Sequence, residues 1–263
     1  MRKLEPSAGD RRQNLKNATV IKRIACYVFA VFFVLAGWYI TAIIIDKPAL
    51  PTPAETVPVF LKYAYDLWPD FQISLWRLAF SLFIGTITAL PIGLFLGRSK
   101  KAEALFTPVL NILYPLPKIV LLPILLAIFG LGGAPKVALI SLTIFFQVVV
   151  VMRDAARALP QSMIDRMYTL GCSKLRALTK VIIPATTPEL FTTLRVSSAV
   201  AIAVLFFAEA IAGSTGLGYF IMNSWSMVNY PRMFAGIIAL AILGVIIYEI
   251  FDIAERLATR WKR

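Results

Sequence analysis

Residues 24–45 read IACYVFAVFFVLAGWYITAIII and contain no charged side chain. A helix needs about 20 consecutive apolar residues to cross the roughly 30 Å hydrocarbon layer of a membrane. Five further apolar segments occupy residues 71–96, 104–130, 136–152, 181–209 and 233–252. We therefore predict an all-α integral membrane protein with about six transmembrane helices.

Two of these segments depart from a simple apolar span. Arg195 lies inside the fifth segment, and four prolines interrupt the third: Pro108, Pro115, Pro117 and Pro123. Inside a membrane, irregular backbone is tolerated only where protein or a water-filled cavity satisfies the freed polar groups. We expect such surroundings at both places.

The composition of the 263-residue chain also favours a membrane. Hydrophobic residues make up 59% of it, and its mean hydropathy is +0.77. Both exceed the usual range of soluble domains. The first apolar segment follows basic residues, as in a signal peptide, but it is longer than a signal core of about 7–15 residues. We interpret it as a retained anchor.

The charge of the chain is strongly positive, with 27 Lys and Arg against 14 Asp and Glu. A basic protein can bind nucleic acid, so the positions of the charges decide the interpretation. If both termini are cytoplasmic, 20 of the 27 basic residues fall in inner tails and loops. Positive residues are retained in the cytoplasm, so topology explains the excess and we expect no nucleic-acid partner.

This topology divides the chain into five parts. They are a basic cytoplasmic tail at 1–23, an anchor helix at 24–45, a periplasmic segment at 46–70, a transmembrane domain at 68–252 with an inner loop at 153–184, and a basic cytoplasmic tail at 253–263. Four prolines between residues 48 and 58 predict an extended lead-in and then a short amphipathic helix in the periplasmic segment.

Residue sets for most cofactor and catalytic sites are missing from the sequence. There is no His, and the two cysteines, Cys26 and Cys172, do not make a zinc motif. No Gly-x-x-x-x-Gly-Lys-Ser/Thr phosphate loop occurs, so another chain must handle any ATP. Gly213, Gly216 and Gly218 imitate a dinucleotide fingerprint but follow an apolar segment, which predicts a tight turn. We expect no cofactor, metal or catalytic residue.

The inner loop at 153–184 has its own helix signals. Ser162 and Asp165 predict a capping box, Gly171 a left-handed helix end, and Ser173 a second cap. We therefore predict two short helices joined at Gly171. The first carries an apolar stripe at helical spacing, which indicates either a partner protein or the membrane surface. The stripe comprises Met163, Ile164, Met167 and Leu170.

This loop resembles that of the permease subunits of type I, binding-protein-dependent ABC importers. The family's loop reads Glu-Ala-Ala, three residues, Gly, nine residues, Ile, one residue, Leu-Pro. At the same spacing this chain has Asp165-Arg166-Met167, Gly171, Val181 and Ile183-Pro184. Asp thus replaces Glu, both alanines are replaced, and the later aliphatic residues are exchanged for similar ones.

An alternative register begins at Asp154-Ala155-Ala156, which is closer to the family by its letters. In that register the glycine would fall on Pro160, so spacing favours the register at Asp165.

Further stretches are similar to the nitrate, sulfonate and taurine branch of the family, and the resemblance covers roughly residues 48–255. They are LPTPAET (50–56), SLWRL (74–78), PIGLFLG (91–97), YPLPK (114–118) and GLGY (216–219). The resemblance implies a permease homodimer in the bacterial inner membrane, with one pore, two ATPase subunits and an outer solute-binding protein. It also implies that the loop is a coupling helix seated in a groove of the ATPase. The residues expected there are Asp165, Arg166, Met167, Gly171 and Pro184.

Four ionisable residues at membrane depth are candidates for lining the pathway: Arg77, Lys118, Arg195 and Glu209. Arg77 and Glu209 lie near predicted outer ends and are expected to extend to the water interface. For Lys118 and Arg195 two interpretations stand. Either they line the pathway and favour anions, or they form a buried pair with Glu209 or Glu189 that holds helices together.

The sequence therefore predicts a permease subunit of an ATP-driven importer for a small solute, with a small anion as the expected class. The rival hypothesis is a secondary transporter or channel, against which the scarcity of carboxylates for a proton relay counts. A membrane-embedded enzyme and a structural anchor are weaker alternatives, because nucleophile–base pairs are missing and an anchor needs no broken helices.

Overall fold

The computed structural model describes residues 8–259, and side chains at residues 25, 26 and 28–259. Every regular element in this range is helical, so the predicted fold class is confirmed. The basic tails predicted at 1–23 and 253–263 lie partly outside the described residues.

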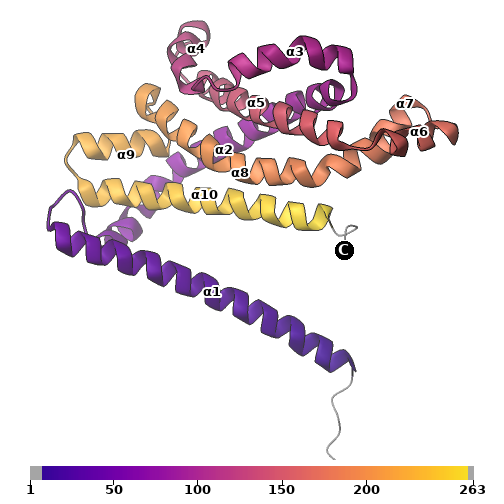
Figure 1. Ribbon diagram of the computed structural model, residues 1–263. Coiled ribbons are helices and arrows are strands. Elements are labelled where there is room, and N and C mark those ends of the chain that lie inside the picture. Colours follow the sequence, from indigo (N-terminus) through magenta and orange to yellow (C-terminus); the bar gives the residue numbers. More distant parts are fainter. Residues whose placement is uncertain (1–7, 260–263) are drawn as a thin grey trace, which may run out of the picture. The chain divides into compact units, whose positions relative to one another are not determined.

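Twelve helical elements follow one another in the described part of the chain (Figure 1). They are α1 (Ala8–Ile45), α2 (Pro53–Arg98), α3 (Lys100–Leu113), η1 (Lys118–Leu121), α4 (Leu122–Phe129), α5 (Ala134–Ala158), α6 (Gln161–Thr169), α7 (Lys174–Ala177), η2 (Leu178–Ile182), α8 (Ile183–Ala212), α9 (Leu217–Ser226) and α10 (Tyr230–Ala258). Among them, η1 is a 3-10 helix and η2 is a π-helix.

The chain divides into two compact units, Met1–Val59 and Phe60–Arg263. In the first unit, the apolar side chains of α1 are largely exposed; Phe29 and Phe33, for example, expose 68% and 69% of their surface. A helix that is apolar on all sides suits a lipid environment. Trp38 ties its end to the following loop by donating from Nε1 to the carbonyl of Pro51, at 3.0 Å.

The structure corrects the prediction for residues 46–70. In place of an extended lead-in, residues 47–50 form a turn in which the N–H of Leu50 donates to the carbonyl of Lys47 at 2.9 Å. α2 then runs without interruption from Pro53 to Arg98, so the expected separate short helix is also wrong. The start of α2 explains the strength of this helix. Thr52 and Glu55 cap each other's backbone N–H groups, and Pro53 occupies the first helical position, where its missing donor costs nothing.

In the second unit α8 packs between α5 and α10, and α9 lies against both α8 and α10 (Figure 1). The middle of this bundle is fully buried and apolar, with Leu139, Ile144 and Leu205 at 0% exposure. Five helices of the described chain are long and apolar enough to cross a membrane, and a bent pair can make a sixth.

A stripe of small residues brings α2 against α5. It consists of Gly85, Ala89, Gly93 and Gly97, spaced four residues apart. A Cβ atom added at Gly85 would lie 2.7 Å from the carbonyl oxygen of Ser141, and one at Gly93 would lie 2.8 Å from the Cβ of Met152. Small residues at this spacing allow transmembrane helices to approach closely. We call these four residues the glycine stripe.

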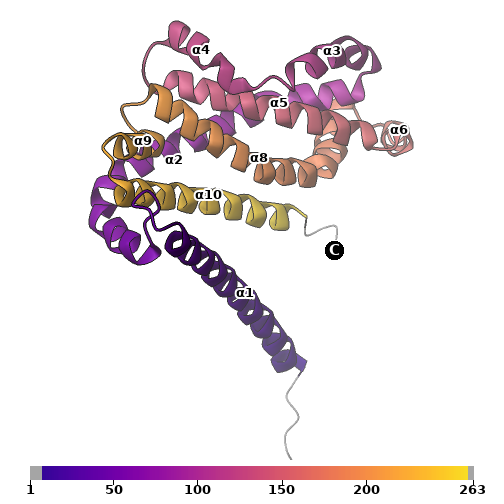
Figure 2. The same cartoon turned by 60° about the vertical axis from the view of Figure 1, so that its left-hand side comes forward.

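The predicted break in the third apolar segment is present. α3 and the η1–α4 pair are bent by 84° around residues 114–117 (Figure 2). Pro115 and Pro117 lie in the break, whereas Pro108 lies within α3 and Pro123 within the first turn of α4. A proline in the first turn loses no intrahelical hydrogen bond, which explains why α4 restarts there.

Candidate functional site

The inner loop forms the two helices that its sequence predicts. At the end of α6, Gly171 has φ +76°, and the N–H of Cys172 donates to the carbonyl of Met167 at 3.0 Å. This is a Schellman ending, in which a left-handed glycine satisfies the last carbonyls of a helix. Ser173 then caps α7 by accepting from the N–H of Arg176. The roles predicted for Gly171 and Ser173 are confirmed.

The capping box predicted for Ser162 and Asp165 is wrong. α6 begins two residues earlier than this box requires, at Gln161, with Pro160 as its N-cap. Ser162 therefore lies inside the helix, where its backbone is already helical and cannot take the N-cap position. Asp165 instead accepts a hydrogen bond of 2.9 Å from the side-chain amide of Gln161.

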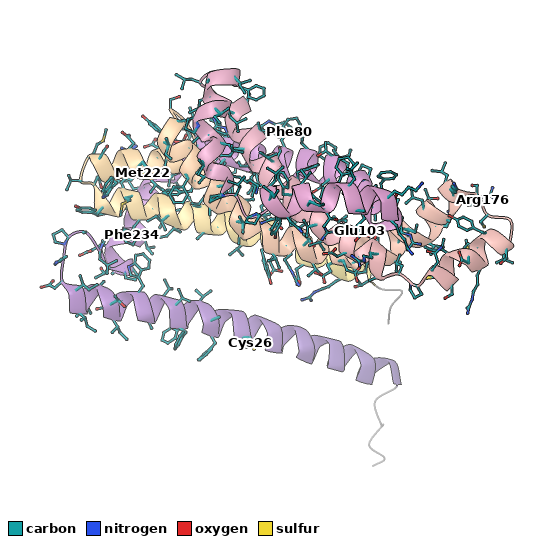
Figure 3. The ribbon with its side chains drawn as sticks, turned by 45° about the horizontal axis from the view of Figure 1, so that its top comes forward. Cys26, Phe80, Glu103, Arg176, Met222 and Phe234 are labelled. Atoms are coloured by element: carbon teal, nitrogen blue, oxygen red, sulfur yellow. The ribbon has the colours of Figure 1, made fainter. Side chains whose placement is uncertain are left out.

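The apolar stripe of α6 divides between two directions. Ile164 is 2% exposed and anchors the helix, whereas Met163 and Leu170 expose 43% and 78% of their surface. Asp165 and Arg166 are also exposed, and Met167 is half-buried. α6 thus offers a mixed apolar and charged face. Figure 3 shows Arg176 of this loop at one end of the second unit, opposite the end that carries Met222.

Arg98, the last residue of α2, holds the loop in place. Its guanidinium donates to the carbonyls of Ala156 and Leu159 at 3.3 and 3.4 Å, and to the side-chain oxygen of Gln161. The amide nitrogen of the same Gln161 side chain donates to Asp165. A continuous chain of hydrogen bonds therefore joins the end of a membrane-spanning helix to the exposed face of α6.

At the opposite end, Glu209 lies at the centre of a buried polar cluster. Its carboxylate accepts from Arg77 at 2.8 Å, from the hydroxyl of Ser74 at 2.8 Å, and from the N–H of Gly218 at 3.0 Å. Arg77 also donates to the carbonyl and hydroxyl of Thr215, both at 2.9 Å. We call these five residues the Glu209 cluster. It joins α2, α8 and the start of α9.

The Glu209 cluster corrects the expectation that Arg77 and Glu209 extend to the water interface. Glu209 is 0% exposed and Arg77 is 8% exposed. The cause is the turn at the glycines, which folds α9 back so that the N–H of Gly218 donates to the carboxylate. Gly216 has φ +106°, and a Cβ added there would overlap the Glu209 carboxylate. Lys136 is likewise buried, at 2% exposure.

Arg195 belongs to a second ionic group, which joins α8 to α10. Arg195 lies 2.9 Å from an oxygen of Asp252 and 3.4 Å from an oxygen of Glu255. Arg256 lies 2.8 Å from the other oxygen of Asp252, and Thr192 donates to Glu255 at 2.9 Å. We call these residues the Arg195 network. The interpretation of Arg195 as a helix-holding charge is thus supported, but its ion pairs are with Asp252 and Glu255 and not with the suggested Glu209 or Glu189. Glu209 pairs with Arg77.

Lys118 caps the broken end of α3. Its Nζ donates to the carbonyls of Leu113, Tyr114 and Leu116 at 2.7, 2.9 and 2.8 Å, which satisfies acceptors that the break leaves open. It also lies 4.6 Å from the ring centre of Phe146. The suggested ion pair of Lys118 with Glu209 or Glu189 is therefore not formed. Its ammonium group binds backbone carbonyls two to five residues earlier in the chain.

Lys118 also borders a cavity of about 390 Å³ between the break, α5 and α8. Phe146, Phe207 and Tyr114 supply aromatic walls, and Gln147 and Thr143 supply polar groups. The side-chain oxygen of Gln147 is buried without a hydrogen-bond partner. A buried acceptor of this kind costs free energy unless water or a ligand satisfies it, so the cavity is suited to a polar guest.

Several residues of these groups were missed at the sequence level. Asp252 and Glu255 lie three residues apart at the end of the last apolar segment, and that spacing on one helix face could have indicated partners for Arg195. No local signal indicated Ser74 or Lys136. Within residues 8–259, no group of three or more Cys, Asp and Glu side chains is placed to hold a metal ion.

The sequence matches, over residues 89–260, the family described as binding-protein-dependent transport system inner membrane component. The taurine transport system permease protein TauC of Escherichia coli (strain K12) is 28% identical, over 85% of this chain and 84% of that protein. The aliphatic sulfonates transport permease protein SsuC of Bacillus subtilis (strain 168) is 29% identical, over 83% and 80%. An ABC transporter permease protein of Haemophilus influenzae is 30% identical, over 77% and 82%.

Among solved structures, a chain of the MetNI methionine ABC transporter in an inward-facing conformation has the same fold. The TM-score is 0.65 at 20% sequence identity, and the match covers 76% of this chain and 99% of the other. At this identity the likeness concerns the fold alone.

Proposed function

Because the chain belongs to the family of binding-protein-dependent transport system inner membrane components, we propose that two copies form the pathway of an ATP-driven importer, each with an ATPase subunit docked on α6. The chain itself is a multi-pass membrane permease, and the rival secondary transporter is not favoured. In this proposal ATP is hydrolysed by the partner subunit, since the sequence has no phosphate loop. The coupling loop at 153–184 lies within a transmembrane domain at 68–252.

The observation that carries the docking proposal is the construction of α6. Its exposed residues, Asp165 and Arg166, sit on a short helix that is fixed at both ends, by Arg98 near its start and by the Gly171 turn at its finish. An exposed, partly apolar face on a rigid support is suited to a protein partner. Met167, Gly171 and Pro184 complete the segment that we assign to docking.

Movement of the loop has two routes into the membrane domain. One passes from Gln161 through Arg98 to α2, and the other passes through η2, which leads directly into α8 at Ile183. We propose that closure of the ATPase subunits moves α6, and that both routes convert this movement into a change of access.

We propose a small sulfonated or comparable anion as the solute, delivered by an outer binding protein. The names of the TauC and SsuC relatives support this class. Of the four charged candidates, Lys118 is the one we assign to the pathway border, because it lines the cavity of about 390 Å³. The partners of Arg77, Arg195 and Glu209 support a helix-holding role for those three.

We also propose that both termini and the α6–α7 loop face the cytoplasm of a bacterial cell, with the chain in the inner membrane. The loop carries Arg166, Lys174, Arg176 and Lys180, and positive residues are retained on that side. Cysteine labelling with a membrane-impermeant reagent tests the orientation. Cys26 is first replaced, so that the half-buried Cys172, between α6 and α7, is the cysteine left to react. Labelling of intact cells from outside would overturn it.

Co-purification with the ATPase subunit tests the docking proposal. Gly171→Pro should abolish retention of the ATPase, because proline cannot adopt φ +76°. Asp165→Lys should lower retention about tenfold, the effect of roughly 1.4 kcal/mol. Asp154→Lys is the matched control, since this carboxylate is 56% exposed on α5 and outside the docking segment. Equal retention by all variants, or none by the wild type, would reject the proposal.

A further inference from the structure

A second cavity, of about 570 Å³, lies where α2 ends beside the α6–α7 loop. Its walls come from the last two turns of α2, from α6 and α7, and from η2 with the start of α8. It shares no lining residue with the cavity that Lys118 borders. It is therefore separate from the cavity that Lys118 borders.

The lining of this cavity is divided into an apolar and a basic part. Pro91, Phe95 and Leu178 belong to the apolar part, whereas Arg98 and Lys174 supply positive charge beside the hydroxyls of Ser99 and Tyr168. No Asp or Glu is among the lining residues. The hydrogen-bond partners of Arg98 are all neutral oxygens, so its charge is available to an anion.

The depth of the cavity matches a lipid headgroup. Arg98 is the last residue of α2, and the apolar residues Leu90 to Phe95 precede it within the membrane-spanning helix. The basic end of the cavity therefore lies where the hydrocarbon layer gives way to headgroups, and the apolar part lies on the hydrocarbon side. Phe95, at 62% exposure, opens the apolar part to the bilayer.

The wall opposite α2 is a π-helix, η2, which contributes Leu178 and Ile182. Short π segments inside α-helices are rare and frequently mark functional sites. Here the wider turn directly precedes α8 and follows the loop helices, so an occupant of the cavity would contact both the loop and the membrane domain.

We propose that this cavity binds one anionic phospholipid, with its phosphate at Arg98 and Lys174 and an acyl chain along Phe95, Leu178 and Ile182. The bound lipid lies beside the Arg98–Gln161–Asp165 chain of hydrogen bonds and stabilises the position of α6 relative to α2. The proposal goes beyond the solute and ATPase assignments and does not depend on either of them.

Lipid retention tests this site. The permease is purified from membranes, with and without its ATPase subunit, and reconstituted in nanodiscs containing equal amounts of phosphatidylglycerol and phosphatidylcholine. After delipidation with mild detergent, the lipids that remain are quantified by mass spectrometry. The wild type should retain phosphatidylglycerol in preference to phosphatidylcholine.

Lys174→Gln should lower this preference roughly fivefold, the effect of one basic residue at an anionic surface. Lys101→Gln is the matched control, because Lys101 is exposed close to the same end of α2 but does not line the cavity. Lys174 is exposed, so its replacement is not expected to disturb folding; Arg98→Gln serves as a second variant.

Phe95→Ser separates a lipid from a free phosphate, because only an acyl chain would lose contacts with Phe95. Equal retention of the two lipids by the wild type, or an unchanged preference in Lys174→Gln, would overturn the proposal. An unchanged amount of retained phosphatidylglycerol in Phe95→Ser would also overturn it, because the proposed acyl chain lies along Phe95. If lipid is retained but no ATPase co-purifies, only the docking proposal fails.

Discussion

The Glu209 cluster and the Arg195 network both join distant helices through charges, but they are built differently. Glu209 is 0% exposed, forms an ion pair with Arg77 and accepts from the backbone N–H of Gly218. In the Arg195 network two acids meet two arginines, and the arginine side chains are 24% and 50% exposed. Loss of either partner from a buried pair is strongly destabilising, whereas a network with partly exposed arginines is less sensitive to loss of one charge. We infer that the Glu209 cluster holds α2, α8 and α9 in one arrangement. The contact between α8 and α10 at the Arg195 network tolerates change more readily.

The largest expected effect comes from Glu209→Ala. It leaves the Arg77 guanidinium buried without a counter-charge, which typically costs about 3–5 kcal/mol. We expect little folded protein in the membrane, measured by fluorescence-detected size-exclusion chromatography of a tagged chain. If this variant reached wild-type levels with wild-type thermal stability, the Glu209 cluster would not be more sensitive to loss of a charge than the Arg195 network.

Arg195→Met should have a smaller effect, about 1–3 kcal/mol, because Asp252 keeps Arg256 as a partner and the Arg195 side chain is 24% exposed. The variant should accumulate in the membrane with a lowered melting temperature. The measurement is a thermal unfolding curve in detergent, beside that of Glu209→Ala. A loss as severe as that of Glu209→Ala would contradict the greater tolerance of the contact at the Arg195 network.

Ser74→Ala tests the polar support of Glu209 without removing a charge. The hydroxyl of Ser74 donates to Glu209 and accepts from the N–H of Leu217 at 2.8 Å. Loss of both bonds should cost about 1–2 kcal/mol, since a buried N–H is left without a partner. Ser226→Ala, whose hydroxyl bonds in an exposed position, is the control and should unfold like the wild type.

Arg256→Gln should have the smallest effect, at most about 0.5 kcal/mol, because this half-exposed side chain forms an i,i+4 pair with Asp252. The same thermal unfolding curve measures it, at low and at high salt. A large loss of stability would show that Arg256, and not Arg195, holds α10 to α8.

Much of the fold follows from local sequence. The apolar segments, the break at Pro115 and Pro117, and the helix end at Gly171 each depend on residues that are near one another in the chain. Apolar length and backbone conformation are properties of short stretches, so such features can be predicted. The predicted start of α6 was wrong because Pro160, and not Ser162, occupies the N-cap position.

The ionic groups were harder to predict because their partners are distant in the sequence. Arg77 and Glu209 are 132 residues apart, and no local pattern indicates that the α8–α9 turn buries them together. Arg195 and Asp252 are 57 residues apart. Burial of a charge depends on which helices meet, and sequence position relative to an apolar segment only indicates that a charge lies at membrane depth.

The glycine stripe packs α2 closely against α5 and so restricts their relative movement. From Gly85 to Gly97 it spans about 18 Å of helix, over which α2 and α5 are separated by little more than backbone atoms. If α2 slid along α5, larger side chains would clash at positions where only glycine or alanine fits. We therefore expect the two helices to move together. Arg98 follows the last glycine directly and donates hydrogen bonds to the carbonyls of Ala156 and Leu159 at the start of the loop. A displacement of the loop would therefore be expected to move α2 and α5 together.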